Sequence, residues 1–330
     1  MTVPALVKTW GYDVSNVETF TTDTELGQKM QWNIKEALVT AGWSVVASCN
    51  GDGITAVKNI GDPSPDLWVA YTDVIQASVG AHSWVALYNS TMDLTFLIDC
   101  LATNVYSCDI AIIDGAVNAD GTTALRPTTV TGVEKFYSNL DTGPGRPYSA
   151  TQFVWHAWYS TDNKAFRFAA RSNGSNPGHV TIFIQEPSNV PDLWLDPAVF
   201  AIQSNASTDV SWTNLLFYQA KITLVTRVNG VMTHLMYISS ESHYNGDDPS
   251  SRYVDVSPRD LSSDAGYLMC PMGLIGNDVG VRGSNGRIDD MWWGPGSMVI
   301  GDTIIESGSR DFICFAEFML PWNDTVPVIS

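Results

Sequence analysis

The apolar residues that follow Thr22 recur at the spacing of an α-helix and predict one amphipathic helix near the start of the chain. Thr22 and Glu25 are placed as a capping box, in which each side chain can satisfy a free N–H of the first turn. Gly42 can end the helix, because glycine readily adopts the left-handed conformation of a helix C-cap. We expect the apolar face of this helix to be buried against the segments that follow. The positions on that face are Leu26, Met30, Ile34, Ala37, Leu38 and Ala41.

After Gly42 the pattern changes to short runs of strand-forming residues separated by turn residues. The runs at 84–88 and 94–98 are predicted to be hairpin partners across the turn at 89–93. A helix followed by short antiparallel strands predicts a compact module over residues 1–120. The other predicted strands of this module lie at 43–49, 66–71 and 108–113.

Residues 121–150 are rich in Gly, Thr, Pro and Asn, and they are predicted to form a linker or a long loop. A second module is predicted over residues 151–330, with long loops. Its first strands, at 153–159 and 165–170, flank a hairpin turn at 161–164. A third strand is expected at 180–184.

Asn229 and Gly230 predict a two-residue hairpin turn between strands at 222–228 and 231–238, because both central residues of a type I′ turn need positive φ. Residues 240–290 contain many glycines and are predicted to be mostly loop. A last strand is expected at 312–319. The predicted fold is therefore mainly β (α+β), with two modules of antiparallel, sandwich-like sheets and one N-terminal amphipathic helix.

The chain has few charged residues for its size, and this changes the expectation about its surface. Only 16% of its 330 residues are charged, whereas 45% are hydrophobic and 11% are aromatic; soluble domains usually have about 25% charged residues. Such a surface is either covered by Ser, Thr, Asn and Gly or buried against neighbouring chains. Because aromatic residues are enriched in interface cores, the composition favours a protein of an assembly.

The net charge of −18 excludes two classes of partner. Phosphate contacts need clustered Lys and Arg, and the sequence has no such cluster, so nucleic acid is not an expected partner. An anionic membrane surface is disfavoured for the same reason. No apolar run approaches 18 residues and no signal-peptide pattern opens the chain, so we expect no membrane insertion and synthesis in the cytoplasm.

The five cysteines are an odd number without CxxC spacing, so neither a disulfide framework nor a structural zinc site is expected. Synthesis in a reducing compartment explains this pattern most simply. The alternative is a single disulfide, for instance between Cys100 and Cys108, that forms once the protein meets an oxidising exterior.

The histidines and carboxylates are the candidate residues for chemistry. His156 and His234 lie in strand-like runs and are predicted to be structural. His243 and Tyr244 lie in the polar stretch at 241–248, which is either a metal or sugar site or an exposed polar loop. The Asx/Gly loops at 50–53 and 114–121 lack EF-hand spacing and are predicted to be turns.

Asp289 and Asp290, beside Trp292 and Trp293, are the one local combination of carboxylates with an aromatic platform. A glycoside hydrolase needs two carboxylates facing each other across a cleft. Neighbouring residues of a strand point to opposite faces, so these two are not expected to form that pair with each other. The sequence also lacks a GxSxG elbow and a P-loop. We therefore predict no enzyme, no cofactor and no metal site.

The order of several short motifs resembles a family of tailed-bacteriophage virion structural proteins. The motifs are Trp158-Tyr159-Ser160-Thr161-Asp162 with Phe166-Arg167-Phe168, the run from Val180 to Pro187, the run from Gly286 to Gly294, and the run from Gly308 to Phe312 followed by Leu320-Pro321-Trp322-Asn323. The resemblance implies a structural protein of the virion, in the tail or baseplate, that contacts other virion proteins and further copies of itself. Homo-oligomers of this kind are usually symmetric.

Three alternatives stay open. A glycan-binding receptor module of a phage tail would take a host glycan on an interaction loop with Trp292, Trp293, His243 and Tyr244, whose aromatic rings would stack on sugars. A capsid decoration protein is the second alternative. A hydrolase, which would need two inward-facing carboxylates, is the third.

Overall fold

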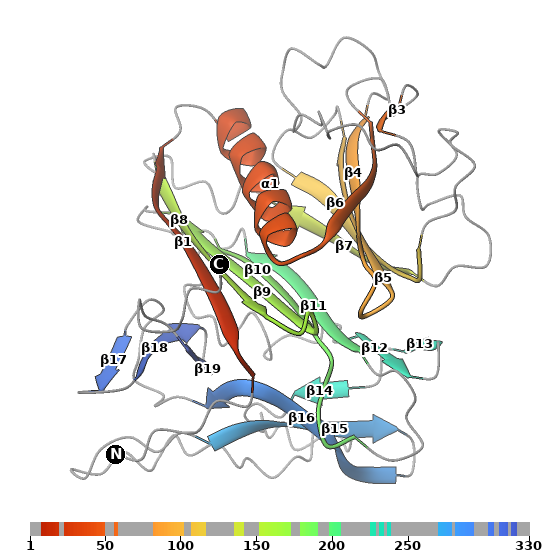
Figure 1. Ribbon diagram of the computed structural model, residues 1–330, viewed down its shortest axis with the longest axis vertical. Helices are drawn as coiled ribbons and strands as arrows, with labels where there is room; N and C mark the ends of the chain where they lie inside the picture. The colour runs from red at the N-terminus through yellow and green to blue at the C-terminus, as the bar shows by residue number, and fades with distance from the viewer. Residues whose placement is uncertain are drawn as a thin grey trace, which may run out of the picture.

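The fold is known from a computed structural model. It describes residues 8–19, 23–49, 56–58, 82–101, 107–116, 135–141, 152–172, 179–190, 198–205, 225–228, 231–233, 236–238, 270–278, 281–293, 303–306, 310–315 and 318–321. This part of the chain forms three antiparallel sheets and one α-helix, and the helix lies between two of the sheets (Figure 1). The prediction of a mainly β fold with antiparallel sheets and one N-terminal helix is confirmed.

The central sheet has seven strands, and they come from both of the predicted modules. Its strands, in spatial order, are β1 (Trp10–Thr19), β8 (Gln152–Ser160), β9 (Ala165–Ser172), β10 (His179–Gln185), β11 (Ala198–Asn205), β12 (Val225–Val228) and β13 (Val231–Thr233). Strand β1 was not predicted, and it pairs antiparallel with β8. Strand β1 is therefore built into the sheet of the second half, across the predicted boundary between the modules.

A second sheet, here the N-terminal sheet, has six strands. In spatial order they are β3 (Ala56–Lys58), β2 (Ser44–Cys49), β4 (His82–Asn89), β5 (Leu94–Leu101), β6 (Ser107–Asp114) and β7 (Lys135–Asp141). The predicted hairpin of β4 and β5 is confirmed, since Asn89 pairs with Leu94 across a four-residue turn. Strand β7 lies where the sequence predicts a linker, and it pairs with β6 along its whole length. The strand predicted at 66–71 lies outside the described residues.

The third sheet, here the C-terminal sheet, corrects two predictions. Its strands, in spatial order, are β14 (Met236–Ile238), β15 (Cys270–Asp278), β16 (Val281–Trp293), β19 (Phe318–Pro321), β18 (Arg310–Phe315) and β17 (Thr303–Glu306). The prediction of mostly loop up to residue 290 is wrong for β15 and β16, which form a long hairpin. The register of this hairpin shifts between Pro271 and Met272 and again between Gly273 and Ile275, and Gly276 pairs directly with Gly283. Glycines in a strand often mark such irregular pairing. The single strand predicted at 312–319 is a hairpin instead, closed where Phe315 pairs with Phe318.

Helix α1 (Asp23–Thr40) ends as the sequence predicts. Gly42 has a φ of 88°, its N–H donates to the carbonyl of Val39 at 2.9 Å, and the N–H of Trp43 donates to the carbonyl of Leu38 at 3.0 Å. These two bonds are those of a Schellman C-cap. Thr22 of the predicted capping box lies outside the described residues.

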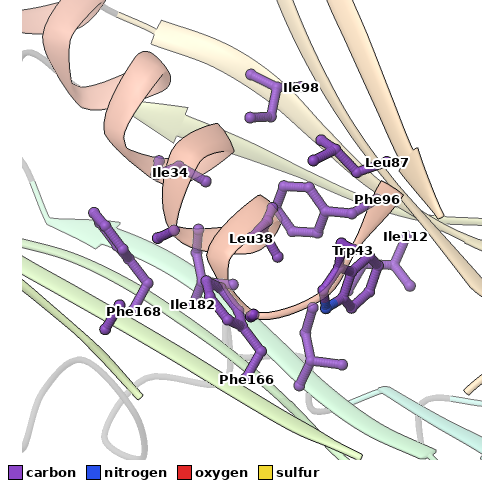
Figure 2. Close-up of a cluster of buried hydrophobic side chains, with 14 of the residues drawn as sticks. Ile34, Leu38, Trp43, Leu87, Phe96, Ile98, Ile112, Phe166, Phe168 and Ile182 are labelled. Carbon is purple, nitrogen blue, oxygen red and sulfur yellow. The ribbon is translucent and has the colours of Figure 1, made fainter. Parts of the chain in front are cut away.

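The apolar face of α1 fills the space between the N-terminal and central sheets (Figure 2). Ile34 and Leu38 are fully buried, and they share one core cluster with Phe96 of β5 and Phe166 of β9. A fully buried side chain of this kind contributes about 1.5–3 kcal/mol relative to an exposed one. The predicted burial is confirmed at Met30, Ile34, Ala37, Leu38 and Ala41, and one continuous core joins the helix to both sheets. The side chain of Leu26 lies outside the described part of the structure.

The turns at the ends of two hairpins also join these sheets. The predicted turn at 161–164 connects β8 and β9, with Asn163 at a φ of 57°. The side-chain amide of Asn89, at the end of β4, donates to the carbonyl of Asn163 at 2.9 Å, while its Oδ1 accepts the backbone N–H groups of Thr91 and Met92. One buried Asn therefore orders its own turn and bonds to a turn of the neighbouring sheet.

No helix in the described part of the chain is long and apolar enough to cross a membrane.

Candidate functional site

The predicted interaction residues do not gather into an exposed loop in the described structure. Trp292 lies in strand β16, is 3% exposed and meets Phe312 edge-on at 5.4 Å between ring centroids. The expectation of an exposed aromatic platform is therefore wrong at Trp292. Trp293 is also in β16, where it stands opposite Cys270 and Phe318 in register. His243 and Tyr244 lie outside the described residues.

Asp289 and Asp290 lie in a bulge of strand β16. Pro271 of β15 pairs with Trp292 and Met272 pairs with Ile288, so the residues between Ile288 and Trp292 have no counterpart on β15. Asp290 has a φ of 55°, a value that Asp tolerates better than most residues. Both Asp residues are buried, with 4% and 2% exposure. The bulge interrupts the strand alternation on which the prediction for this pair was based, and the two carboxylates bond to different partners.

Arg167 of β9 reaches this bulge from the central sheet and is completely buried. Its Nη1 donates to the carbonyl oxygen of Asp290 at 2.8 Å, and its Nη2 donates to the carbonyl oxygen of Asp289 at 2.6 Å. Nη2 also donates to Oε1 of Gln185 at 2.5 Å, and Nε2 of Gln185 donates to the same Asp289 carbonyl at 3.2 Å. We call Arg167, Gln185, Asp289 and Asp290 the Arg167 cluster.

The two carboxylates of the cluster are held by other donors of the same chain. Oδ2 of Asp290 accepts the indole N–H of Trp10 at 2.5 Å and the backbone N–H of Lys8 at 2.8 Å. Oδ1 of Asp289 accepts the hydroxyl of Ser188 at 2.6 Å. The cluster therefore joins β1, β9 and β10 of the central sheet to β16 of the C-terminal sheet.

The environment of Arg167 is apolar except for these partners. Its guanidinium carbon lies 4.4 Å from the ring centroid of Trp10 and 5.6 Å from that of Phe183, within the range of cation–π attraction. Burial lowers the pKa of Arg167 to about 9, and the negative charges of Asp290 and Asp289 oppose that shift. The side chain thus remains a cation at neutral pH.

A second bond joins the same two sheets beside the cluster. The indole N–H of Trp158, which pairs with Arg167 across β8 and β9, donates to the carbonyl of Pro321 in β19 at 2.5 Å. The cluster residues are at most 4% exposed, so no substrate can reach these carboxylates without opening the interface between the sheets. The arrangement suits the rigid attachment of one sheet to another rather than a cleft for a glycoside.

His156 is placed in β8, in agreement with the prediction that it lies in a strand. Its Nδ1 lies 2.7 Å from the hydroxyl oxygen of Tyr12, and its ring stacks with those of Tyr12 and Trp158 at 6.0 and 5.8 Å. Burial lowers the pKa of His156 to about 4, so the ring is neutral at physiological pH. A neutral, stacked imidazole of this kind stabilises the pairing of β1 with β8 through cross-strand contacts. His234 lies outside the described residues.

Sequence reasoning missed Arg167 as the centre of a cluster, although a signal was present. The run at 165–170 is apolar at every position but Arg167, which is typical of a strand covered on both faces. A buried Arg needs acceptors, and Asp289 and Asp290 form a pair of acidic residues much later in the sequence. Joining the two observations required the pairing of distant segments, which no local pattern contains.

The described aromatic side chains serve mainly the interior of this chain. Trp10, Trp43, Trp84, Trp158 and Trp292 are buried, whereas the large apolar residues that stay exposed are Trp32 and Val39 of α1. The inference that abundant aromatics mark subunit interfaces is therefore not supported by the described residues. Within the same residues, no group of three or more His, Cys, Asp and Glu side chains could hold a metal ion.

The geometry thus gives a buried structural cluster and a small exposed patch on α1. A comparison of the chain with known protein families and with curated protein sequences finds no match.

Proposed function

We propose that the chain is a structural component of a bacteriophage virion, located in the tail or the baseplate and tail-tip region and acting through protein–protein interfaces. The motif order from Trp158 to Asn323, through its resemblance to tailed-bacteriophage virion proteins, supports this role. On this proposal the protein is made in the host cytoplasm, binds other virion proteins and further copies of itself, and leaves the cell as part of the particle.

The observation that carries the proposal is the low charge of the chain, with 16% charged residues. Interface cores are depleted of charged residues, so a surface with few of them is suited to being covered by other chains. The outer face of α1 is one place for such a contact, because Trp32 and Val39 are each 39% exposed there.

The Arg167 cluster supports a structural rather than a catalytic role. Its cation and its two carboxylates are buried and bonded within the chain, and they fasten one sheet to another. A part of a particle that carries mechanical load needs such fixed orientation between its sheets more than it needs an accessible charged cleft.

The test is whether the purified chain assembles. We expect light scattering to give a mass of several chains, alone or with the proteins encoded beside it, and we expect Trp32→Ser with Val39→Ser to weaken that assembly. Thr40→Ser, at an exposed position of the same helix, is the matched control and should leave assembly unchanged. A chain that stays monomeric with every neighbouring gene product would contradict the proposal.

A glycan array separates this proposal from the receptor module. The wild-type chain and the Trp293→Ala variant are compared, since Trp292 is buried and its removal would disturb the fold. Binding of the wild type that the variant loses would favour the receptor module over an assembly role alone.

A further inference from the structure

The register of β5 and β6 sets two cysteines directly opposite each other. Cys100 pairs with Cys108 in the antiparallel ladder that runs from Leu94 opposite Asp114 to this last pair. Opposite residues of antiparallel strands have Cα atoms about 4.5–5.5 Å apart and lie on the same face of the sheet. Disulfides join Cα atoms that are about 4.4–6.8 Å apart, so the backbone already meets this requirement.

The other three cysteines occupy positions that exclude them as partners of this pair. Cys49 of β2 pairs with Trp84 of β4, which in turn pairs with Asp99 of β5. Asp99 directly precedes Cys100, and successive residues of a strand alternate between faces, so Cys49 lies on the face of the N-terminal sheet opposite to that of Cys100. The remaining two lie in the C-terminal sheet. Cys270 and Cys314 are separated there by β16 and β19, and neighbouring strands are about 4.8 Å apart.

We propose that Cys100 and Cys108 form a cross-strand disulfide when the protein passes from a reducing compartment into an oxidising solution. The oxidant is a small-molecule disulfide such as oxidised glutathione. One cysteine thiolate attacks a glutathione sulfur and releases one glutathione thiolate, which leaves a mixed disulfide on the protein. The second cysteine thiolate attacks the protein sulfur of that mixed disulfide and releases the second glutathione. The protein is oxidised by two electrons, and two molecules of glutathione thiol are formed.

The disulfide would join β5 to β6 beside the short connection between them. Closing a loop of this length restricts the unfolded chain more than the folded one, in which the two residues are already opposite. Oxidation should therefore raise the thermal midpoint of unfolding by about 4 °C for a chain of this size. This inference does not depend on where the protein acts, and it goes beyond the proposed virion role.

The test is a thiol count on the folded, full-length protein after incubation with oxidised glutathione. We expect the free thiols to fall from five to three, and non-reducing peptide mapping to find Cys100 joined to Cys108. Cys100→Ser should lose no thiol to an internal disulfide, whereas the control Cys270→Ser should still lose two.

Three results would overturn the inference. One is a wild-type protein that keeps all five thiols or stops at a stable mixed disulfide with glutathione. Another is a crosslink that joins a different pair or persists in Cys100→Ser. The third is an oxidised protein that melts below the reduced protein, because the register would then not suit the bond.

Discussion

Replacing Arg167 with Met should detach the C-terminal sheet from the central sheet at a cost that can be worked out from the cluster. Met has a similar length and no charge, so the change removes the three donor contacts to Asp289, Asp290 and Gln185 while keeping much of the volume. Two carbonyl oxygens and one amide oxygen then lose a buried donor, and each such loss costs about 1–3 kcal/mol.

The variant also leaves the negative charges of Asp289 and Asp290 buried without their cation. Removing one partner of a buried charge pair typically costs about 3–5 kcal/mol. Because this figure already includes the hydrogen bonds lost with the cation, the two costs are not added, and we expect Arg167→Met to lower the free energy of unfolding by about 3–5 kcal/mol. Arg167→Lys should also be destabilising, since a single ammonium cannot reach acceptors on both sides of the guanidinium fork.

The assay is urea denaturation followed by tryptophan fluorescence, together with hydrogen exchange of β16. The control is Lys164→Met, which removes a cation from a partly exposed pair with Glu186 at 2.9 Å and should cost less than about 1 kcal/mol. In Arg167→Met, the amides of β16 should exchange faster while those of β4 and β5 stay protected. A loss no larger than that of the control, with unchanged exchange in β16, would refute the idea that the cluster holds the two sheets together.

Three further changes test other parts of the fold. Burial lowers the pKa of His156 from 6.5 to about 4, so the neutral ring favours the folded state above pH 6.5. This contribution, about 3 kcal/mol, is lost as the pH falls from 6.5 to 4. Urea titrations should show a smaller loss over that range in His156→Gln, and an equal loss would contradict the assignment. Gly42→Ala should cost about 1–2 kcal/mol, because the φ of Gly42 is 88° and the added Cβ would lie 2.9 Å from Oδ1 of Asn163. Gly115→Ala, at a φ of 76° with its nearest atom at 3.9 Å, should cost less, and the reverse order in thermal melts would be inconsistent with a tight C-cap. Gly11→Ala should cost about 1–3 kcal/mol because the added Cβ would overlap the Tyr159 ring. Most of that cost should vanish in a Tyr159→Ala background, as a double-mutant cycle would measure.

Elements set by local chemistry were predictable from the sequence. The C-cap at Gly42 and the apolar face that includes Ile34 and Leu38 follow from spacing alone, and the structure confirms both. The turn at 161–164 was predictable for the same reason, because its residues decide its backbone conformation.

Elements set by distant partners were not predictable in the same way. Strand β1 belongs to the central sheet because β8, more than a hundred residues later, supplies its partner. The hairpin of β15 and β16 was concealed by its glycines, whose usual meaning is a turn. Trp292 is buried against Phe312 of β18, and the bulge at Asp290 is bonded to Arg167 of β9. No local pattern near residue 290 contains either partner.

We propose that this chain is a structural part of a virion. The most direct test of this claim is quantitative mass spectrometry of density-purified particles released by cells that carry its gene. We predict that peptides from the chain copurify with the particles at several copies per particle, in fixed proportion to the tail proteins. Particles that infect normally and contain none of these peptides would contradict the claim.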